Sequence, residues 1–223
     1  MTSHNNTEWK LNETITIEKE GVEMCTDSVL HCYNHPLLAV VFNPVHANIK
    51  NPRLFEISVD KIVNTDGLKF ASKSQTLVKE IDLPEISLEQ RIEFAIRVAK
   101  TVYKDESWNL WADRWLNGED RSKESAFTAA RAATSAARAA NAAVDPAYAA
   151  YAAVDPAYAA ARAVALAAYY AAAAAYAAAA YAAAYAAAAA ADAALAANAA
   201  YNFDKNEFNR KMIELIESIC KHE

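Results

Sequence analysis

The chain has 223 residues, with 28 acidic and 22 basic side chains and a net charge of −6. This length allows one or two domains, and the acidic balance argues against a broad electrostatic footprint for nucleic acid. The composition changes near Ser122: all tryptophans and glycines precede it, and alanine dominates afterwards. We predict an α+β protein, with a small, mostly antiparallel β-rich head domain over residues 1–86 and an all-helical, alanine-rich module with close helix packing.

The cysteine count and the N-terminal sequence indicate a cellular location. Three cysteines without a regular framework argue against a disulfide-built secreted domain. Residues 1–10 contain neither the basic head nor the apolar core of a signal peptide. Residues 163–191 carry no charge, but alanine adds little to membrane insertion, which leucine and isoleucine drive. We expect a cytoplasmic protein with no membrane partner and no nucleic-acid partner.

The head domain is predicted from short runs of β-branched and apolar residues. Four runs have the composition of strands: Thr14–Ile17, Leu37–Phe42, Leu54–Val59 and Thr76–Ile81. Turn-forming residues separate them, among them Gly21, Pro36 and the pair Asp66-Gly67. This alternation of strands and turns predicts a small antiparallel sheet.

Residues 87–121 are predicted to form two linking helices. Ser87 and Gln90 have the spacing of a capping box at the start of the first helix. The second helix begins near Asp105 and ends near Gly118, a typical C-terminal cap. One face of it carries a stripe spaced by three and four residues, a pattern more typical of a core than of a ligand site: Trp108, Trp111 and Trp115.

Residues 122–202 form the alanine-rich segment, whose larger residues recur with a mean spacing near 3.5, as in a coiled coil. Two near-identical decapeptides, at 141–150 and 151–160, each contain Asp-Pro, which predicts a break in the helix. From residue 156 to about 200 we expect a long helix, either straight or folded back. The segment is predicted to be a jointed scaffold that sets a homo-oligomer, with an ice-binding or membrane role as the alternative.

Residues 203–223 have the pattern of a conventional amphipathic helix. Its apolar side is marked by residues spaced four, three and four apart: Phe208, Met212, Leu215 and Ile219. Acidic and basic residues supply the opposite side. We expect this helix to dock on the long alanine-rich helix or on a second copy of the chain.

Reactive side chains are densest between residues 25 and 46, where Cys25, His31, Cys32, His35 and His46 lie. Their spacing is not a standard zinc pattern, and a strand there would place His31 and Cys32 on opposite faces. The sequence contains no P-loop, GxGxxG, GxSxG or HExxH motif. We therefore assign no metal, no cofactor and no catalytic residue, and a cysteine nucleophile beside His31 stays an open alternative.

Several of these motifs, taken in order, resemble an uncharacterised domain of phage and bacterial proteins. The stretch MCTDSVLHCYNHPLLAVVF is similar to its start, LFEISV to a following strand, and QTLVKEID to a later one. The resemblance continues into an alanine-rich tail. Val29 stands where the family usually has glycine. The positions that match the family's motifs, and that the resemblance marks as candidate ligand-binding residues, are Cys25, His31, Asp66 and Lys69.

A second resemblance links the strand around His31 to the Gly-Ile-Tyr strand of ADP-ribosyltransferase-like folds, on analogy alone. The expectation is a non-enzymatic, phage-encoded binding protein in the host cytoplasm. Its head would bind a host protein or a small ligand, and its helical module would be a scaffold. The alternatives are a virion or assembly component and an ADP-ribosyltransferase-like enzyme or nucleotide-binding relative.

Overall fold

The chain forms two compact units in the computed structural model, which describes residues 7–46, 49–65, 67–102, 106–122, 124–126, 128–129 and 204–221. The N-terminal unit comprises residues 1–86 together with residues 204–223, and the helical unit comprises residues 87–203. The last helix therefore belongs to the same unit as the first strands, although the whole helical unit lies between them in the sequence.

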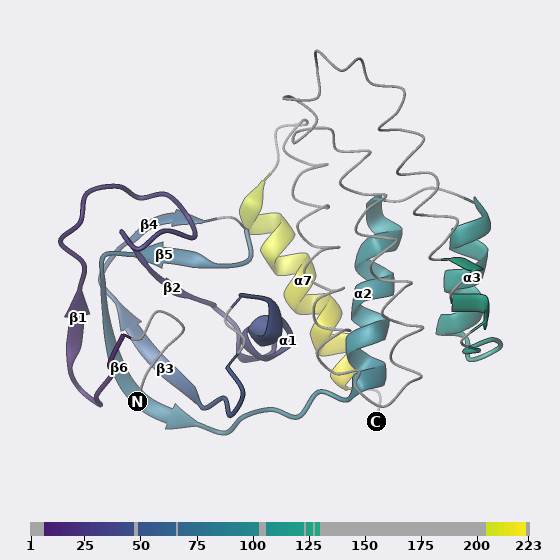
Figure 1. The fold of residues 1–223 in the computed structure, drawn as a ribbon, viewed down its shortest axis with the longest axis horizontal. Helices are drawn as coiled ribbons and strands as arrows, with labels where there is room; N and C mark the ends of the chain where they lie inside the picture. The colour runs from purple at the N-terminus through teal and green to yellow at the C-terminus, as the bar shows by residue number, and fades with distance from the viewer. Residues whose placement is uncertain are drawn as a thin grey trace, which may run out of the picture. The chain divides into compact units, whose positions relative to one another are not determined.

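The N-terminal unit contains two small antiparallel sheets (Figure 1). One has the order β1-β6-β3 and consists of Thr14–Thr16, Ser74–Ile81 and Leu54–Val59. The other has the order β2-β5-β4 and consists of Leu30–Cys32, Phe70–Ser72 and Ile62–Thr65. These sheets, with the helices of the chain, confirm the predicted α+β class and three of the four predicted strands.

Lys73 is the single residue between β5 and β6, where the chain passes from one sheet to the other. Its Nζ atom donates hydrogen bonds to the carbonyl oxygens of Lys19 (2.6 Å), Gly21 (2.6 Å) and Ser28 (2.7 Å). An ammonium group has three donors, so these carbonyls use its full capacity. Lys73 thereby fastens the irregular segment of residues 19–28 to the sheets.

The predicted strand Leu37–Phe42 is wrong, because these residues lie in helix α1, Pro36–His46. Pro36 takes the first helical position, where a missing N–H group costs nothing, and the Ala39 N–H donates to the His35 carbonyl (3.2 Å). Periodicity alone does not separate a short apolar run in a buried strand from one in a buried helix. In α1 that run supplies fully buried core residues: Leu38, Val41 and Phe42.

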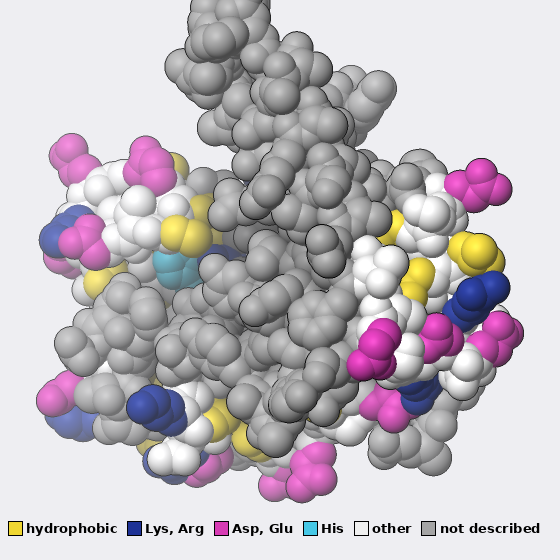
Figure 2. Space-filling model, turned by 45° about the vertical axis from the view of Figure 1, so that its right-hand side comes forward, with side chains coloured by type: hydrophobic (Ala, Val, Ile, Leu, Met, Phe, Trp, Pro, Cys, Tyr) yellow, Lys and Arg dark blue, Asp and Glu magenta, His cyan; other side chains and the backbone are white. Residues whose placement is uncertain are grey.

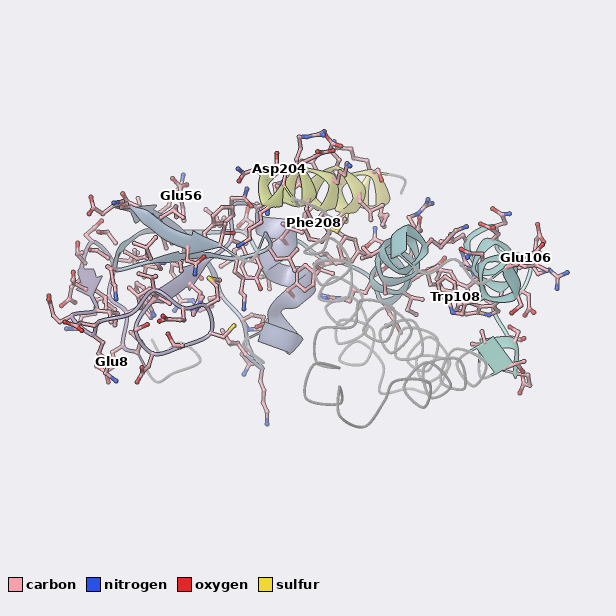
Figure 3. The ribbon with its side chains drawn as sticks, turned by 90° about the horizontal axis from the view of Figure 1, so that it is seen from above. Glu8, Glu56, Glu106, Trp108, Asp204 and Phe208 are labelled. Atoms are coloured by element: carbon pink, nitrogen blue, oxygen red, sulfur yellow. The ribbon has the colours of Figure 1, made fainter. Side chains whose placement is uncertain are left out.

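Helix α7, Lys205–Cys220, completes the N-terminal unit and confirms the predicted amphipathic helix. The Asp204 carboxylate caps it by accepting hydrogen bonds from two backbone N–H groups. Its buried side, on which Phe208 lies, contacts α1 (Figure 3). Asn34 Nδ2 donates to Asn209 Oδ1 (2.7 Å), and Lys205 Nζ donates to the Thr65 carbonyl (2.6 Å). The expected long-helix partner lies outside the described residues, and the observed partner is α1.

The helical unit begins with α2, Leu88–Val102, and α3, Glu106–Leu116. The capping box is confirmed, since Ser87 N donates to Gln90 Oε1 (2.7 Å) and Gln90 N donates to Ser87 Oγ (3.2 Å). Gly118, with φ of +74°, ends α3. The stripe of Trp108, Trp111 and Trp115 is buried, as predicted for a core. In Figure 3 Trp108 lies between the two helices.

The alanine-rich segment, predicted over residues 122–202, falls almost wholly outside the described residues. Its described part, residues 124–126 and 128–129, is helical. Within the described chain, no helix has the length and apolar character needed to cross a bilayer. The expected joints at residues 145–146 and 155–156 also lie outside the described residues.

The described surface mixes charges of both signs (Figure 2). In the N-terminal unit Arg53 pairs with Glu80, and Lys79 Nζ lies 3.0 Å from Glu56 Oε2. Such exposed pairs each contribute little to stability. In the described part of the face shown in Figure 2, basic and acidic side chains are interspersed.

Candidate functional site

Three of the four predicted ligand-binding residues, Cys25, His31 and Lys69, lie together at the edge of the sheet β2-β5-β4. Lys69 Nζ lies 3.2 Å from Cys25 Sγ, and the Cys25 N–H donates to His31 Nε2 (3.0 Å). The fourth predicted residue, Asp66, lies outside the described residues. Cys25, His31 and Lys69 come from different parts of the chain, so the fold creates this cluster.

Strand pairing explains how these residues meet. His31 lies in β2 opposite Ala71 of β5, and Lys69 directly precedes β5. Cys25 lies in the segment of residues 19–28 that Lys73 fastens to the sheets. Its φ of +63° is in the left-handed region, which is uncommon for a residue with a side chain. The surrounding hydrogen bonds therefore hold Cys25 in a costly conformation.

The cluster combines a buried amine with an exposed thiol. Only 7% of the Lys69 surface is exposed, whereas Cys25 is an exposed residue. Thr65 Oγ1 donates to the Lys69 carbonyl (2.7 Å), which fixes the backbone at the end of β4 and the start of β5. His31 accepts at Nε2 and therefore carries its ring proton on Nδ1. This arrangement places an exposed thiol against an amine whose residue is buried.

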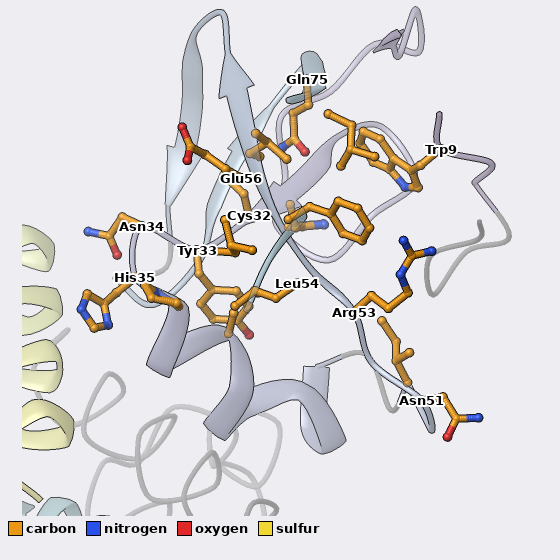
Figure 4. Close-up of a pocket in the computed structure, with 18 residues that line it drawn as sticks. Trp9, Cys32, Tyr33, Asn34, His35, Asn51, Arg53, Leu54, Glu56 and Gln75 are labelled. Atoms are coloured by element: carbon orange, nitrogen blue, oxygen red, sulfur yellow. The ribbon is translucent and has the colours of Figure 1, made fainter. Parts of the chain in front are cut away.

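A pocket of about 720 Å³ lies beside the cluster, and His31 contributes to both (Figure 4). Its walls come from β2, β3, β6 and the start of α1. Most of its lining residues are apolar or aromatic: Trp9, Cys32, Tyr33, Pro36, Ala39, Ile49, Leu54, Phe55, Ile57, Leu77 and Ile81. A concave, mainly apolar cavity of this size is typical of sites for small organic molecules.

Gln75 supplies a polar group within this apolar lining. Its side chain extends toward the pocket in Figure 4, and only 2% of its surface is exposed. Gln75 Nε2 donates to Ser72 Oγ (2.9 Å), which fixes the orientation of the amide. Gln75 therefore places an amide, with one acceptor oxygen, in the wall of the pocket.

Arg53 forms a charged margin of the pocket. Its guanidinium lies 5.0 Å from the centre of the Phe55 ring and pairs with the Glu80 carboxylate. The hydrogen bonds from Arg53 lower the pKa of Glu80, and those to Glu80 raise the pKa of Arg53. Because this pair is exposed, it contributes mainly to the orientation of Arg53.

The other predicted reactive residues are Cys32, His35 and His46. Cys32 is half-buried in the pocket wall, where burial raises the pKa of its thiol to about 11. His35 Nε2 lies 3.2 Å from Glu217 Oε1 of α7. The side chain of His46 lies outside the described residues. Among the described residues no group of three or more His, Cys, Asp or Glu side chains is arranged to hold a metal ion.

The sequence does not single out Gln75, Arg53 or Lys73, although each helps to form the site. A glutamine in a strand is an ordinary residue, and only the folded structure buries it beside a cavity. For Lys73 the sequence offers one signal, a charged residue between two runs of strand-forming residues. The chain passes from one sheet to the other at this position.

Residues 1–89 match the profile of a family described as a domain of unknown function (DUF7666). The match covers most of the N-terminal unit and agrees with the expectation of an uncharacterised domain in this part of the chain. No curated protein and no solved structure matches the chain significantly.

Proposed function

We propose that this chain is a non-enzymatic binding protein whose N-terminal unit takes a small ligand in the pocket. The observation that carries this proposal is the buried residue Gln75, whose amide lies in the wall of a mainly apolar cavity of about 720 Å³. The ligand is a mainly apolar or aromatic molecule that presents one hydrogen-bond donor to the Gln75 oxygen. Trp9, Tyr33 and Phe55 offer flat surfaces for such a molecule.

In this proposal the helical unit acts as a scaffold. Alanine-rich residues 122–202 would assemble copies of the chain, so that several pockets are presented together. The proposal extends to a phage-encoded protein that acts in the host cytoplasm. A host protein as partner is the alternative occupant, and a virion component is the alternative role. Light scattering of the purified chain tests the assembly, and a strict monomer contradicts it.

Filling the pocket tests the binding proposal. Ala39 lines the cavity and is half-buried, so Ala39→Phe places a ring inside it. Val78→Phe is the matched control, because Val78 is exposed on β6. Aromatic fragments that bind the wild-type chain in ligand-observed NMR should bind the control and not Ala39→Phe. Binding that persists in Ala39→Phe contradicts the assignment of the ligand to this pocket.

The Gln75 contact has its own test with a matched pair of probes, indole and 1-methylindole. Indole carries an N–H donor and its methylated form does not. We expect the wild-type chain to bind indole about tenfold more tightly, the value of one hydrogen bond. Gln75→Leu should abolish this preference while it retains binding of 1-methylindole. Equal affinity of the wild-type chain for both probes contradicts the proposed role of Gln75.

A further inference from the structure

We propose that Cys25 and Lys69 form an oxidation site, in which peroxide converts the Cys25 thiol to a sulfenic acid and Lys69 captures it as a covalent sulfur–nitrogen bond. The observation is the placement of Lys69 Nζ 3.2 Å from Cys25 Sγ, with the lysine buried and the cysteine exposed. The site lies outside the pocket lining apart from the shared neighbour His31. It is independent of the proposed ligand.

The two side chains approach one another from different environments. Cys25 is open to solvent, so a small oxidant reaches the sulfur directly. Lys69 extends from the protein side, because only 7% of its surface is exposed. An amine held this close to a sulfur reacts as an intramolecular partner and has a large advantage over any amine in solution.

The backbone around Cys25 keeps the sulfur beside the amine. The Cys25 N–H donates to His31 Nε2, and Lys73 holds the carbonyls of Gly21 and Ser28 on either side. The left-handed conformation of Cys25 is retained by these contacts. A flexible loop would let the oxidised sulfur turn into solvent, where it would be oxidised further.

The chemistry balances with one peroxide molecule. The Cys25 thiolate attacks one peroxide oxygen, the O–O bond breaks, and the departing hydroxide takes up a proton to form water. Lys69 gives up one proton to solvent, the lone pair of its amine then attacks Sγ, and the S–O bond breaks. The second hydroxide leaves as water with a proton from the nitrogen. Sulfur is oxidised, peroxide is reduced, and the protein loses two hydrogen atoms.

Mass spectrometry of the full chain tests this cross-link. The other cysteines, Cys32 and Cys220, are first replaced in a C32S/C220S variant, so that no disulfide within one chain is possible. After hydrogen peroxide treatment we expect the intact mass to fall by two hydrogen atoms, and peptide mapping to join Cys25 to Lys69. Dithiothreitol should restore the starting mass.

Lysine variants identify the capturing group. In the C32S/C220S background, Lys69→Arg should retain one added oxygen on Cys25 and react with dimedone, whereas the exposed control Lys61→Arg should still form the cross-link. If Lys69→Arg does not fold, the peptide map of the chain that retains Lys69 decides alone. Oxygen added to Cys25 with Lys69 unmodified, or a dimer joined through two Cys25 residues, overturns the proposal.

Discussion

The two units of this chain are stabilised by contacts of different range. In the N-terminal unit Cys25 meets Lys69 across 44 residues, and Asn34 meets Asn209 across 175. In the described part of the helical unit the contacts span shorter separations, from three residues between Ser87 and Gln90 to 32 residues between Glu89 and Arg121. Local contacts form as a helix forms, whereas the site around Cys25 exists only when several strands have paired. Substitutions should therefore act locally in one unit and at a distance in the other.

The largest expected effect separates the two units. Trp108→Ala removes the most deeply buried tryptophan of the helical unit and should lower its stability by about 3–5 kcal/mol. Urea unfolding followed by circular dichroism measures the loss. Leu110→Ala, at an exposed position of the same helix, should cost less than about 0.5 kcal/mol. Retained labelling of Cys25 and retained fragment binding would show that the effect stays in one unit, and their loss would contradict it.

The next largest effect is expected for a substitution of Lys73, which should alter residues 19–28, far from it in the sequence. Lys73→Met leaves the carbonyls of Lys19, Gly21 and Ser28 without their shared donor and should cost about 1–3 kcal/mol. Hydrogen exchange should rise across residues 19–28, which include Cys25. Lys61→Met, at an exposed position, is the control. Unchanged exchange in Lys73→Met would show that other contacts hold the segment.

A smaller effect concerns the local pair at the start of α2. Ser87→Ala removes one half of the capping box and should destabilise the helical unit by about 1 kcal/mol. A double-mutant cycle with Gln90→Ala measures the coupling, because each side chain bonds to the other's backbone. Strictly additive losses would mean that the two hydrogen bonds act independently.

The smallest effect near neutral pH comes from Cys32. Burial raises the pKa of its thiol from 9.0 to about 11, so folding favours the neutral thiol. The associated stability is fully present below pH 9 and is lost as the pH rises from 9 towards 11. Between these values the wild-type chain should lose more stability than Cys32→Ala, and both should respond alike at pH 7. Parallel losses up to pH 11 would contradict the assigned burial.

Short-range patterns predicted the parts of the fold that depend on neighbours. The capping box, the tryptophan stripe and the amphipathic helix after Asp204 follow from spacings of three and four residues. The strand prediction for Leu37–Phe42 was wrong because an unbroken apolar run is compatible with a buried strand and with a buried helix. Pro36, at the first position of α1, favours the helix.

The candidate site was only partly predictable. A resemblance in short motifs identified Cys25, His31 and Lys69 as candidates. Neither secondary-structure propensity nor sequence spacing shows that Cys25 contacts Lys69. The pairing of β2 with β5 brings them together. Gln75 could not be predicted as a site residue for a related reason. Its role depends on a cavity that three strands and one helix form jointly.

The position of α7 in the N-terminal unit determines when this unit can finish folding during translation. Helix α7 contacts α1, and Lys205 reaches the end of β4, but these residues leave the ribosome after the whole helical unit. The N-terminal unit therefore waits, with the α1 surface uncovered, while the entire helical unit is translated. Nascent chains stalled before residue 204 should be more protease-sensitive in α1 than chains that include α7, because α7 covers α1 only after the helical unit has been translated.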